Sequence, residues 1–517
     1  MRKLAVLFVV GVMVMAFGVT ANAQPKITMD ITGFIDFAAI LTTNITDARN
    51  PIYGLAGGNV VDPNSGALDK NGAFANSRAR LKFTANAGKE LKGVIFFEMD
   101  SDRWGDYNGT RNSMGYWNSD RAALEVKHVY FAVGLPYFGV PVPITMTFGI
   151  QTVDVRSDFL MGVDGAAIKV NFKADPVNID FWWAKPAEGK VYASDDNDIY
   201  ALHANGAIGD STLGGYWVFQ DNKSYPQQET TINTPGGGEF TYPGLVEDIE
   251  ANSGARSKFN WVGAYWDGKL GPVGLSVDAI YDWGEVRPGW DLSAVPDIRK
   301  VKYNGYFATA RGTYDWEMFM FGGGAWYASG SDVDKTGPNG LPGEVTANGE
   351  FSNKVGAFVV PGGDGPGWPF GYPLVYFGGP FARANNTFAT DSGNITNAGG
   401  VGGTWGAYAY GGFKLAPWYN VWLQAMYLGD TTKNGNTNGN ARQDPTTPAD
   451  TNLRDDKSIG FEFALTNQIT VYDNLELYWG AGYLFAGDAF DIYNESELKN
   501  QSPDNPWDLA TRLVYSF

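Results

Sequence analysis

Apolar and polar side chains alternate along stretches of roughly 10 to 15 residues that recur through most of the chain. In the segment 144–151, for example, four apolar side chains at even positions alternate with Thr, Gly and Gln at odd positions. A period of two is typical of a β-strand with one apolar and one polar face. Eighteen such stretches are predicted, at residues 27–41, 76–87, 91–104, 122–135, 142–153, 166–175, 177–187, 197–207, 211–222, 256–268, 272–286, 302–315, 318–329, 404–416, 419–431, 458–471, 474–487 and 508–517.

The connections between these stretches alternate between short and long. Short ones lie at 88–90, 175–176, 271–274, 315–317 and 417–419. The long ones are rich in Gly, Pro, Asn and Asp and cover 42–75, 105–121, 223–255, 287–301, 330–403, 432–457 and 488–507. Tight periplasmic turns and longer extracellular loops are typical of outer-membrane barrels. We therefore predict an all-β fold, a transmembrane antiparallel up-and-down β-barrel of about 18 strands, with 16 as the alternative.

The N-terminus indicates export. Arg2 and Lys3 precede an apolar stretch from Leu4 to Val19, and Ala21-Asn22-Ala23 follows it. This is the pattern of a cleaved secretory signal peptide, expected at residues 1–23. The remaining residues, 24–517, are then a single barrel domain. Beyond the signal the sequence has no run of about 20 apolar residues that could form a spanning helix.

The C-terminus is a strand that runs to the last residue. Leu513, Tyr515 and Phe517 fall on its apolar face. A terminal Phe preceded by alternating apolar residues resembles the C-terminal signature of bacterial outer-membrane proteins. In those families the barrel assembly machinery reads this signature, so we expect these three residues to act as an assembly signal.

Composition narrows the possible functions. The chain has no Cys and only two His residues, so we expect no thiolate or imidazole metal site and no cofactor. Its formal net charge of −18 argues against nucleic acid as a partner. The sequence contains no nucleophile elbow, phosphate-binding loop or other catalytic motif, so we do not expect an enzyme.

Side chains that face the lumen follow from strand parity, because a charge facing lipid at mid-bilayer costs about 2–4 kcal/mol for Arg or Lys. Arg78, Arg80 and Lys82 share one face of their strand and are predicted to line the pore. The other predicted lumen charges are Glu98, Asp100, Lys127, Lys169 and Arg311. Most of these charges are expected to hydrate and pair across the wall.

Three segments resemble the outer-membrane homotrimeric porins of sulfate-reducing bacteria. They are "SRARLKFTANAGKELKGVIFFEMDSDRWG" (77–105), "VKHVYFAVGLP" (126–136) and "FGIQTVDVRSDFLMGVDGAAIKVNF" (148–172). The resemblance extends over about the first 220 residues, and the segment 330–403 is long for the family. It implies a homotrimer of water-filled barrels in the cell outer membrane of a Gram-negative bacterium, embedded in outer-membrane lipid and lipopolysaccharide.

Analogy with porins also suggests a constriction. In porins the third extracellular loop folds into the barrel and narrows it, and here that loop is 152–165. Its acids Asp154, Asp158 and Asp164 would then oppose the basic residues of the strand 76–87, and opposed charges at close quarters filter solutes by size and charge. A plain surface loop is the alternative.

The predicted function is passive diffusion of small hydrophilic solutes and ions through an outer-membrane porin. The first alternative is a substrate-selective channel of the sugar type, whose lumen would carry an aromatic track. A further alternative is a secreted β-rich adhesin or binding protein, which would not require detergent for its extraction.

Overall fold

A computed structural model describes residues 26–43, 71–101, 103–105, 113–115, 124–135, 143–189, 196–223, 230–234, 238–242, 256–287, 300–337, 340–342, 344–361, 369–378, 401–447, 452–495 and 497–517. The predicted signal peptide, residues 1–23, lies outside the described residues. It stays a prediction.

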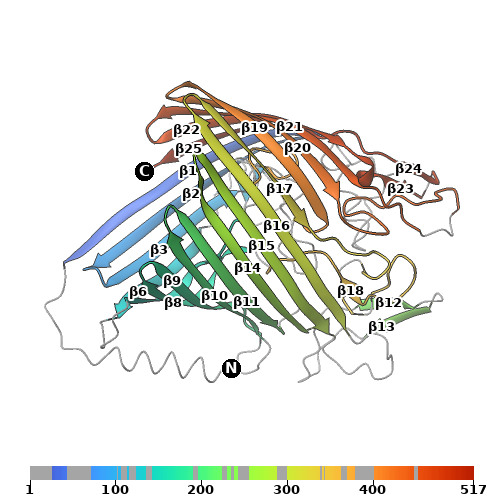
Figure 1. The fold of residues 1–517 in the computed structure, drawn as a ribbon, viewed down its shortest axis with the longest axis horizontal. Helices are drawn as coiled ribbons and strands as arrows, with labels where there is room; N and C mark the ends of the chain where they lie inside the picture. The colour runs from blue at the N-terminus through green and yellow to red at the C-terminus, as the bar shows by residue number, and fades with distance from the viewer. Residues whose placement is uncertain are drawn as a thin grey trace.

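Eighteen long strands pair antiparallel with their neighbours in chain order and form one wall (Figure 1). This number confirms the prediction of 18 strands rather than 16, and each predicted stretch overlaps one strand. The strands are β1 (Ile27–Thr43), β2 (Asn71–Ala87), β3 (Leu91–Ser101), β6 (Glu125–Leu135), β7 (Ile144–Val155), β8 (Met161–Ala174), β9 (Val177–Ala187), β10 (Asn197–Ile208), β11 (Ser211–Asn222), β14 (Arg256–Leu270), β15 (Val273–Arg287), β16 (Val301–Trp316), β17 (Phe319–Ala328), β19 (Thr404–Ala416), β20 (Tyr419–Asp430), β21 (Ser458–Tyr472), β22 (Leu475–Ala486) and β25 (Trp507–Ser516).

Shorter elements lie in the long connections. They are β4 (Arg103–Trp104), β5 (Ser113–Met114), β12 (Thr230–Thr234), β13 (Gly238–Tyr242), β18 (Lys354–Val355), β23 (Ile492–Asn494), β24 (Lys499–Gln501) and the 3₁₀ turn η2 (Asp488–Phe490). Within the described residues, no helix has both the length and the apolar character needed to cross a membrane.

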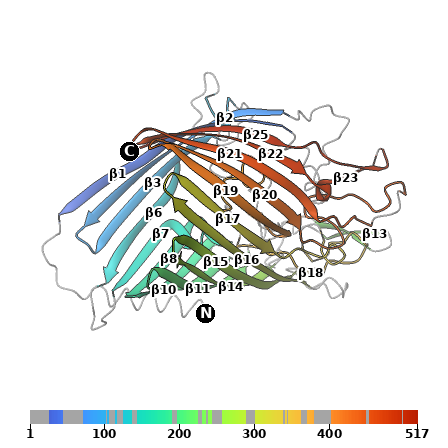
Figure 2. The same cartoon turned by 45° about the horizontal axis from the view of Figure 1, so that its top comes forward.

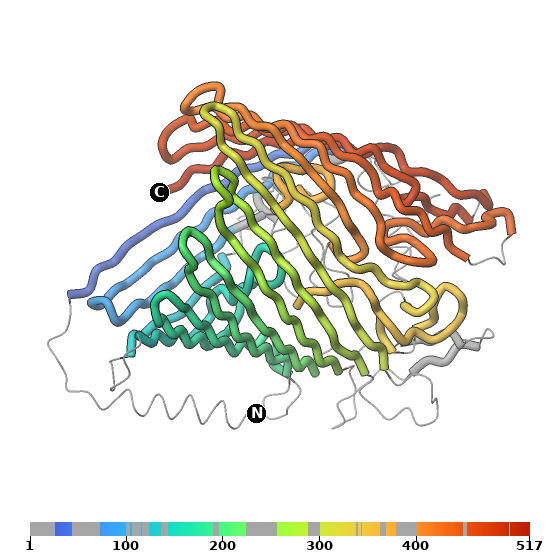
Figure 3. The backbone as a smooth tube through the Cα atoms, in the orientation of Figure 1, coloured from blue at the N-terminus to red at the C-terminus, as the bar shows by residue number. Residues whose placement is uncertain are grey.

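The wall closes on itself between the first and the last strand. β1 pairs antiparallel with β25 from Phe34↔Ser516 to Thr43↔Trp507, and the two lie side by side as the blue and red ends of the trace (Figure 3). Closure leaves no open sheet edge, so every wall strand has a partner on both sides. The lumenal side of this seam carries an ion pair between Arg512 and Asp36, 2.8 Å long.

The terminal residue completes the seam. The N–H of Phe517 donates to the carbonyl of Gly33 at 2.9 Å, and the N–H of Gly33 donates to the carbonyl of Phe517 at 2.8 Å. A Cβ at residue 33 would lie 2.9 Å from the Phe517 ring and closer still to the carbonyl oxygen of Arg80, so only glycine fits there. The ring of Phe517 itself is about half exposed on the outer face, 5.8 Å from that of Tyr515.

The two ends of the barrel differ, as the alternating connections predicted. The C-terminus and the tight turns, such as 88–90, 175–176 and 417–418, lie at one end, and β18, β23 and β24 lie at the opposite end (Figures 1 and 2). One connection at the end with the long loops is unexpectedly short, because only residues 156–160 separate β7 from β8.

The outer face of the wall is apolar. Large hydrophobic side chains alternate with inward positions around the wall and are exposed, among them Ile35 (51%), Leu423 (59%) and Phe463 (46%). Such a continuous apolar exterior suits lipid and does not suit a secreted soluble protein. The protein is a closed transmembrane β-barrel of the outer membrane, and the interpretation as a secreted adhesin or binding protein is wrong.

The seam provides a first test. Phe517→Ala keeps the two backbone hydrogen bonds to Gly33 but removes the ring, whereas deletion of residue 517 removes both. We expect the fraction of folded, heat-modifiable protein in the outer membrane to fall in the substitution and to fall further in the deletion, while export continues. Trp316→Ala removes an exposed aromatic at the same end of the barrel, on β16 and away from the seam, and should leave the folded fraction unchanged. Equal folded fractions in all variants would contradict an assembly role for the terminus.

The orientation of the barrel in the membrane provides a second test. Because the sequence has no native Cys, a thiol reagent labels only an introduced one. Thr447 lies exposed in the long connection between β20 and β21, and Asp210 lies exposed in the tight turn between β10 and β11. We expect a membrane-impermeant maleimide to label Thr447→Cys on intact cells and Asp210→Cys only after the outer membrane is permeabilised. Labelling of Asp210→Cys alone on intact cells would invert the topology.

Candidate pore constriction

The hairpin of β7 and β8 leaves the wall before it turns. β7 pairs with β6 only as far as Ile150, and β8 pairs with β9 only from Ala166 onward. The two strands nevertheless stay paired with each other out to Val155↔Met161. Residues 151–165 therefore form a two-stranded tongue that has lost both neighbours in the wall. We call it the tongue.

The tip of the tongue crosses the lumen. Arg156 donates to Asp267 of β14 at 2.7 Å and to Asp278 of β15 at 2.6 Å. Three strands, β9, β10 and β11, separate β8 from β14 along the wall. The guanidinium also lies over the Tyr265 ring, 4.1 Å from its centroid. Because Asp278 is 1% exposed, the Arg156 charge compensates a carboxylate that would otherwise be buried without a partner.

The base of the tongue is tied to the wall by a second set of charges. Asp164 of β8 pairs with Lys127 and, at 2.8 Å, with His128, both on β6. It also accepts a hydrogen bond from Thr152 at 2.9 Å. The pairing of β3 with β6 skips Lys127, since Phe96 opposes His128 and Phe97 opposes Val126. This bulge lets two consecutive side chains of β6 reach the tongue.

The structure does not bring the predicted basic and acidic sides into direct contact. Arg78 and Arg80 pair instead with Glu98 on the adjacent strand β3, Arg78 at 3.7 Å. Lys127 lies 3.9 Å from Glu98 and so links that cluster to Asp164 on the tongue. Lys82 lies 5.8 Å from the centroid of the Phe96 ring.

The remaining predicted residues are spread around the lumen. Asp158 pairs with Arg311 of β16 at 3.5 Å, and Arg311 also lies over the Phe159 ring at 4.8 Å. Asp154 accepts the N–H of Ser157 at 3.1 Å and so shapes the turn. Lys169 pairs with Asp180 at 3.2 Å. Asp100 is opposite Arg78 in the strand register.

A second segment of chain also lies inside the barrel. Residues 355–361 and 369–377, here called the inner segment, belong to the long connection between β17 and β19. The carboxylate of Glu462 on β21 accepts the N–H groups of Leu374, Val375 and Tyr376 at 2.6, 2.9 and 3.0 Å. Gln424 on β20 accepts the N–H of Tyr372 at 2.7 Å and donates to the carbonyl of Phe370 at 3.0 Å. These inward side chains satisfy backbone groups that have no strand partner.

Aromatic side chains join the inner segment to the tongue. Phe370 stacks on Trp326 of β17 at 4.2 Å between centroids, and Phe159 of the tongue lies 6.3 Å from Phe370. Phe358 stacks on Phe307 of β16 at 5.4 Å, and Phe307 is 5.4 Å from Phe159. The lumen beside β14 to β21 is thus packed with apolar groups.

This packing corrects two expectations. The barrel is not filled with water throughout. Closely packed apolar side chains fill one side of the lumen and leave no room for water between them. The segment 330–403 is also not wholly external, since its described residues 355–361 and 369–377 are inside the wall. The side chains of β2, β3 and β6 that face the lumen remain charged and partly exposed.

Sequence reasoning missed three residues on which this arrangement depends. Arg156 is the sole basic residue of the tongue, and an isolated Arg between acids was the available signal. Glu462 lies on the inward side of a strand rich in Phe and Leu. An acid at such a position, with no basic residue nearby in sequence, indicates a hydrogen-bond donor from a distant part of the chain. His128 could not be assigned by parity, because the bulge at Lys127 interrupts the alternation.

No protein-family model matches this sequence, and no curated protein matches it. The resemblance to porins of sulfate-reducing bacteria therefore stays a prediction. Among solved structures, the chain is similar to OccK8 (OprE) of Pseudomonas aeruginosa, with 8% identity, a TM-score of 0.47, and coverage of 95% of this chain and 98% of that one. It is also similar to OccAB4 of Acinetobacter baumannii, with 9% identity, a TM-score of 0.47, and coverage of 96% and 100%. Likeness at this level carries no inference about what crosses the barrel.

The ion pairs at the tip give a third prediction. Arg156→Gln leaves Asp278 buried without its charge partner, a change that typically costs about 3–5 kcal/mol. We expect the tongue to leave its contacts on β14 and β15, so that single-channel conductance and current noise both increase and thermal stability falls. Asp158→Asn removes a half-exposed carboxylate that pairs with Arg311 at 3.5 Å on the same tip. It serves as the control for the position of the tongue and should leave thermal stability and current noise nearly unchanged. Unchanged conductance in Arg156→Gln would show that the tip does not limit the pore.

Proposed function

We propose that this protein is a passive outer-membrane channel for small hydrophilic solutes and ions. The observation that carries the proposal is the tongue, which extends inside a closed barrel from β7 and β8 to β14 and β15 and is held at its base and at its tip by ion pairs. Barrels of 16 to 18 strands are wide enough to leave an aqueous passage when no element fills them. Here the tongue and the inner segment take up one side of the lumen, and the proposed passage uses the other side.

The passage runs along the charged side of the lumen. Arg78, Arg80 and Lys127 have side chains that are 17–22% exposed, although they lie on inward positions of the wall. Lys169 is 28% exposed and lies over the Trp182 ring at 4.5 Å. Partial exposure at inward positions indicates contact with water in the lumen. Fixed charges beside a narrow aqueous path select by size and charge.

A substrate-selective channel of the sugar type is the second candidate, and one lumenal cluster favours it. Tyr372 of the inner segment stacks on Trp422 at 4.7 Å and meets Tyr410 edge-on at 5.0 Å. Aromatic faces with polar edges bind sugar rings through their apolar faces. Block of the ionic current by added oligosaccharides would favour this candidate over unselective diffusion.

Assembly belongs to the same proposal. Residues 1–23 would direct export and be removed, and Leu513, Tyr515 and Phe517 would present the barrel to the assembly machinery. A homotrimer surrounded by outer-membrane lipid and lipopolysaccharide is the quaternary arrangement that the resemblance to porins implies. No catalytic role is proposed.

Charge reversal tests the channel and its selectivity. Within a constriction, fixed charges act over distances comparable to the Debye length of about 8 Å at physiological salt. In planar bilayers under a salt gradient, we expect Arg80→Glu to shift the reversal potential toward cation preference and Asp158→Lys to shift it toward anion preference. Lys302→Glu makes the same charge change as the first variant on the outer face of the wall, and should leave the reversal potential in place. If purified protein conducts no current, the proposed function is wrong. If it conducts and neither lumenal variant shifts the potential, selectivity is set elsewhere.

A further inference from the structure

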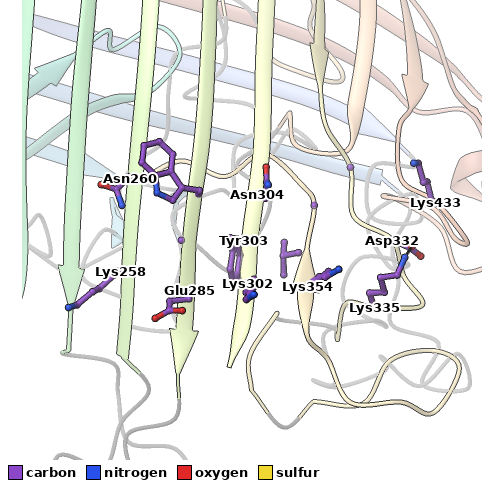
Figure 4. Close-up of a pocket in the computed structure, with 15 residues that line it drawn as sticks. Lys258, Asn260, Glu285, Lys302, Tyr303, Asn304, Asp332, Lys335, Lys354 and Lys433 are labelled. Atoms are coloured by element: carbon purple, nitrogen blue, oxygen red, sulfur yellow. Dashed lines mark hydrogen bonds and ion pairs between the residues drawn. The ribbon is translucent and has the colours of Figure 1, made fainter. Parts of the chain in front are cut away.

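A row of three lysines and one glutamate lies on the outer face of the barrel at the end with the long loops (Figure 4). Strand pairing places Lys258 opposite Glu285, Glu285 opposite Lys302, and Lys302 opposite Lys354. These four residues occupy neighbouring strands β14, β15, β16 and β18. The row is therefore continuous across four adjacent strands, which lie about 4.8 Å apart.

The row faces outward. Along β14 and β16, buried and exposed residues alternate, and Lys258 and Lys302 fall on the exposed set while Phe259 and Tyr303 are buried. β18 pairs with β16 in parallel, beyond the point where the pairing of β16 with β17 ends at Phe307. Lys354 is consequently exposed beside Lys302, whereas Val355 is buried.

Within the described residues, the lysines of this row have no counter-charge of their own. Glu285 is shared with Lys300, at 2.8 Å, and with Arg287. Among the described residues, no carboxylate lies within salt-bridge distance of Lys258, Lys302 or Lys354. Like charges on directly adjacent strand positions destabilise a sheet. Within the part of the chain that the structure describes, the pair Lys302 and Lys354 therefore presents two unneutralised positive charges to an anion from outside the barrel.

The row also borders a pocket. It has a volume of about 720 Å³ and is lined further by Lys335 and Lys433, which come from two different long connections. Lys335 pairs with Asp332, and Asn434 donates to the same carboxylate at 2.7 Å. The second contact joins the two connections to each other. Five lysines, on β14, on β16 and in these two connections, therefore line one pocket.

The position of the pocket relative to the membrane identifies the kind of anion. The next outward-facing row lies two residues closer to the middle of the barrel than the lysine row. There, strand pairing aligns Asn260, Trp283 and Asn304. Trp283 stacks on Tyr281 at 5.5 Å, and further along β16 Tyr306 stacks on Tyr327 of β17 at 5.6 Å. Outward Trp and Tyr side chains mark the membrane–water boundary of a barrel. With a rise of about 3.4 Å per residue, the lysine row lies about 7 Å beyond the Trp283 row, at the level of lipid headgroups.

From this geometry we infer that the pocket binds the phosphorylated headgroup of a lipid in the outer leaflet. Lysine ammonium groups are point charges suited to phosphate, and clustered Lys residues beside the bilayer recognise anionic headgroups. The apolar outer face below the pocket contacts the acyl chains of the same lipid. A free phosphate ion would share the charge contacts but not this apolar surface.

The test compares lipids that differ only in their phosphates. Detergent-purified, heat-modifiable protein is titrated with bisphosphorylated lipid A, with the same lipid after dephosphorylation, and with inorganic phosphate, and bound ligand is measured by native mass spectrometry. We expect the bisphosphorylated lipid to bind at least tenfold more tightly than either other ligand, and its affinity to fall as salt rises.

Variants locate the site. Lys302→Glu/Lys354→Glu should weaken binding of the bisphosphorylated lipid at least tenfold, and Lys302→Gln/Lys354→Gln should weaken it less. Lys269→Glu/Lys414→Glu changes two exposed lysines at the end with the tight turns by the same charge and should bind as the unmodified protein does. Equal affinity in the unmodified and Lys302→Glu/Lys354→Glu proteins would overturn the inference. Equal affinity for inorganic phosphate and lipid would overturn the assignment to a lipid, and neither result bears on conduction.

Discussion

Backbone hydrogen bonding between strands is the constraint on which the whole structure depends. Lipid offers no partner for an N–H or C=O group, so each wall strand must be paired on both sides, and the last pairing, β1 with β25, completes the cylinder. Once the wall is closed, alternate side chains necessarily point to lipid or to the lumen. The apolar exterior, the charged lumen and the inward anchors for the tongue and inner segment all follow from that separation.

The two elements inside the lumen meet the same constraint by different means. The tongue keeps its own two-stranded hydrogen bonding and needs the wall only at its tip and base, where Arg156 and Asp164 form ion pairs. The inner segment has almost no strand structure of its own, and side chains of the wall supply what its backbone lacks. Glu462 alone receives three consecutive N–H groups. One element is thus positioned by charge, and the other by hydrogen bonds from the wall.

Alternation allowed the strands, their faces and their number to be predicted, because lipid imposes a period of two on every wall strand. The same reasoning placed Arg78 and Arg80 on inward positions. Alternation could not identify the partner of these two arginines, because both Glu98 and the acids of the tongue face the lumen. In the structure the arginines pair with Glu98, which lies on the adjacent strand. The contact between Arg156 and Asp278 joins positions 122 residues apart, and no local pattern encodes it. The inner segment escaped prediction for a similar reason: its composition is that of a loop, and only the fixed wall around it gives its aromatic residues something to pack on.

The short strand β18 places one chain segment in two environments. Lys354 faces the surroundings of the barrel and Val355 faces its interior, with one peptide bond between them. An insertion or deletion of a single residue just before this pair would exchange the two faces. It would direct an ammonium group toward the packed aromatic residues and a valine toward the headgroups. The external parts of the connection between β17 and β19 can therefore vary in length. Next to β18, only insertions or deletions of an even number of residues keep Lys354 outside and Val355 inside.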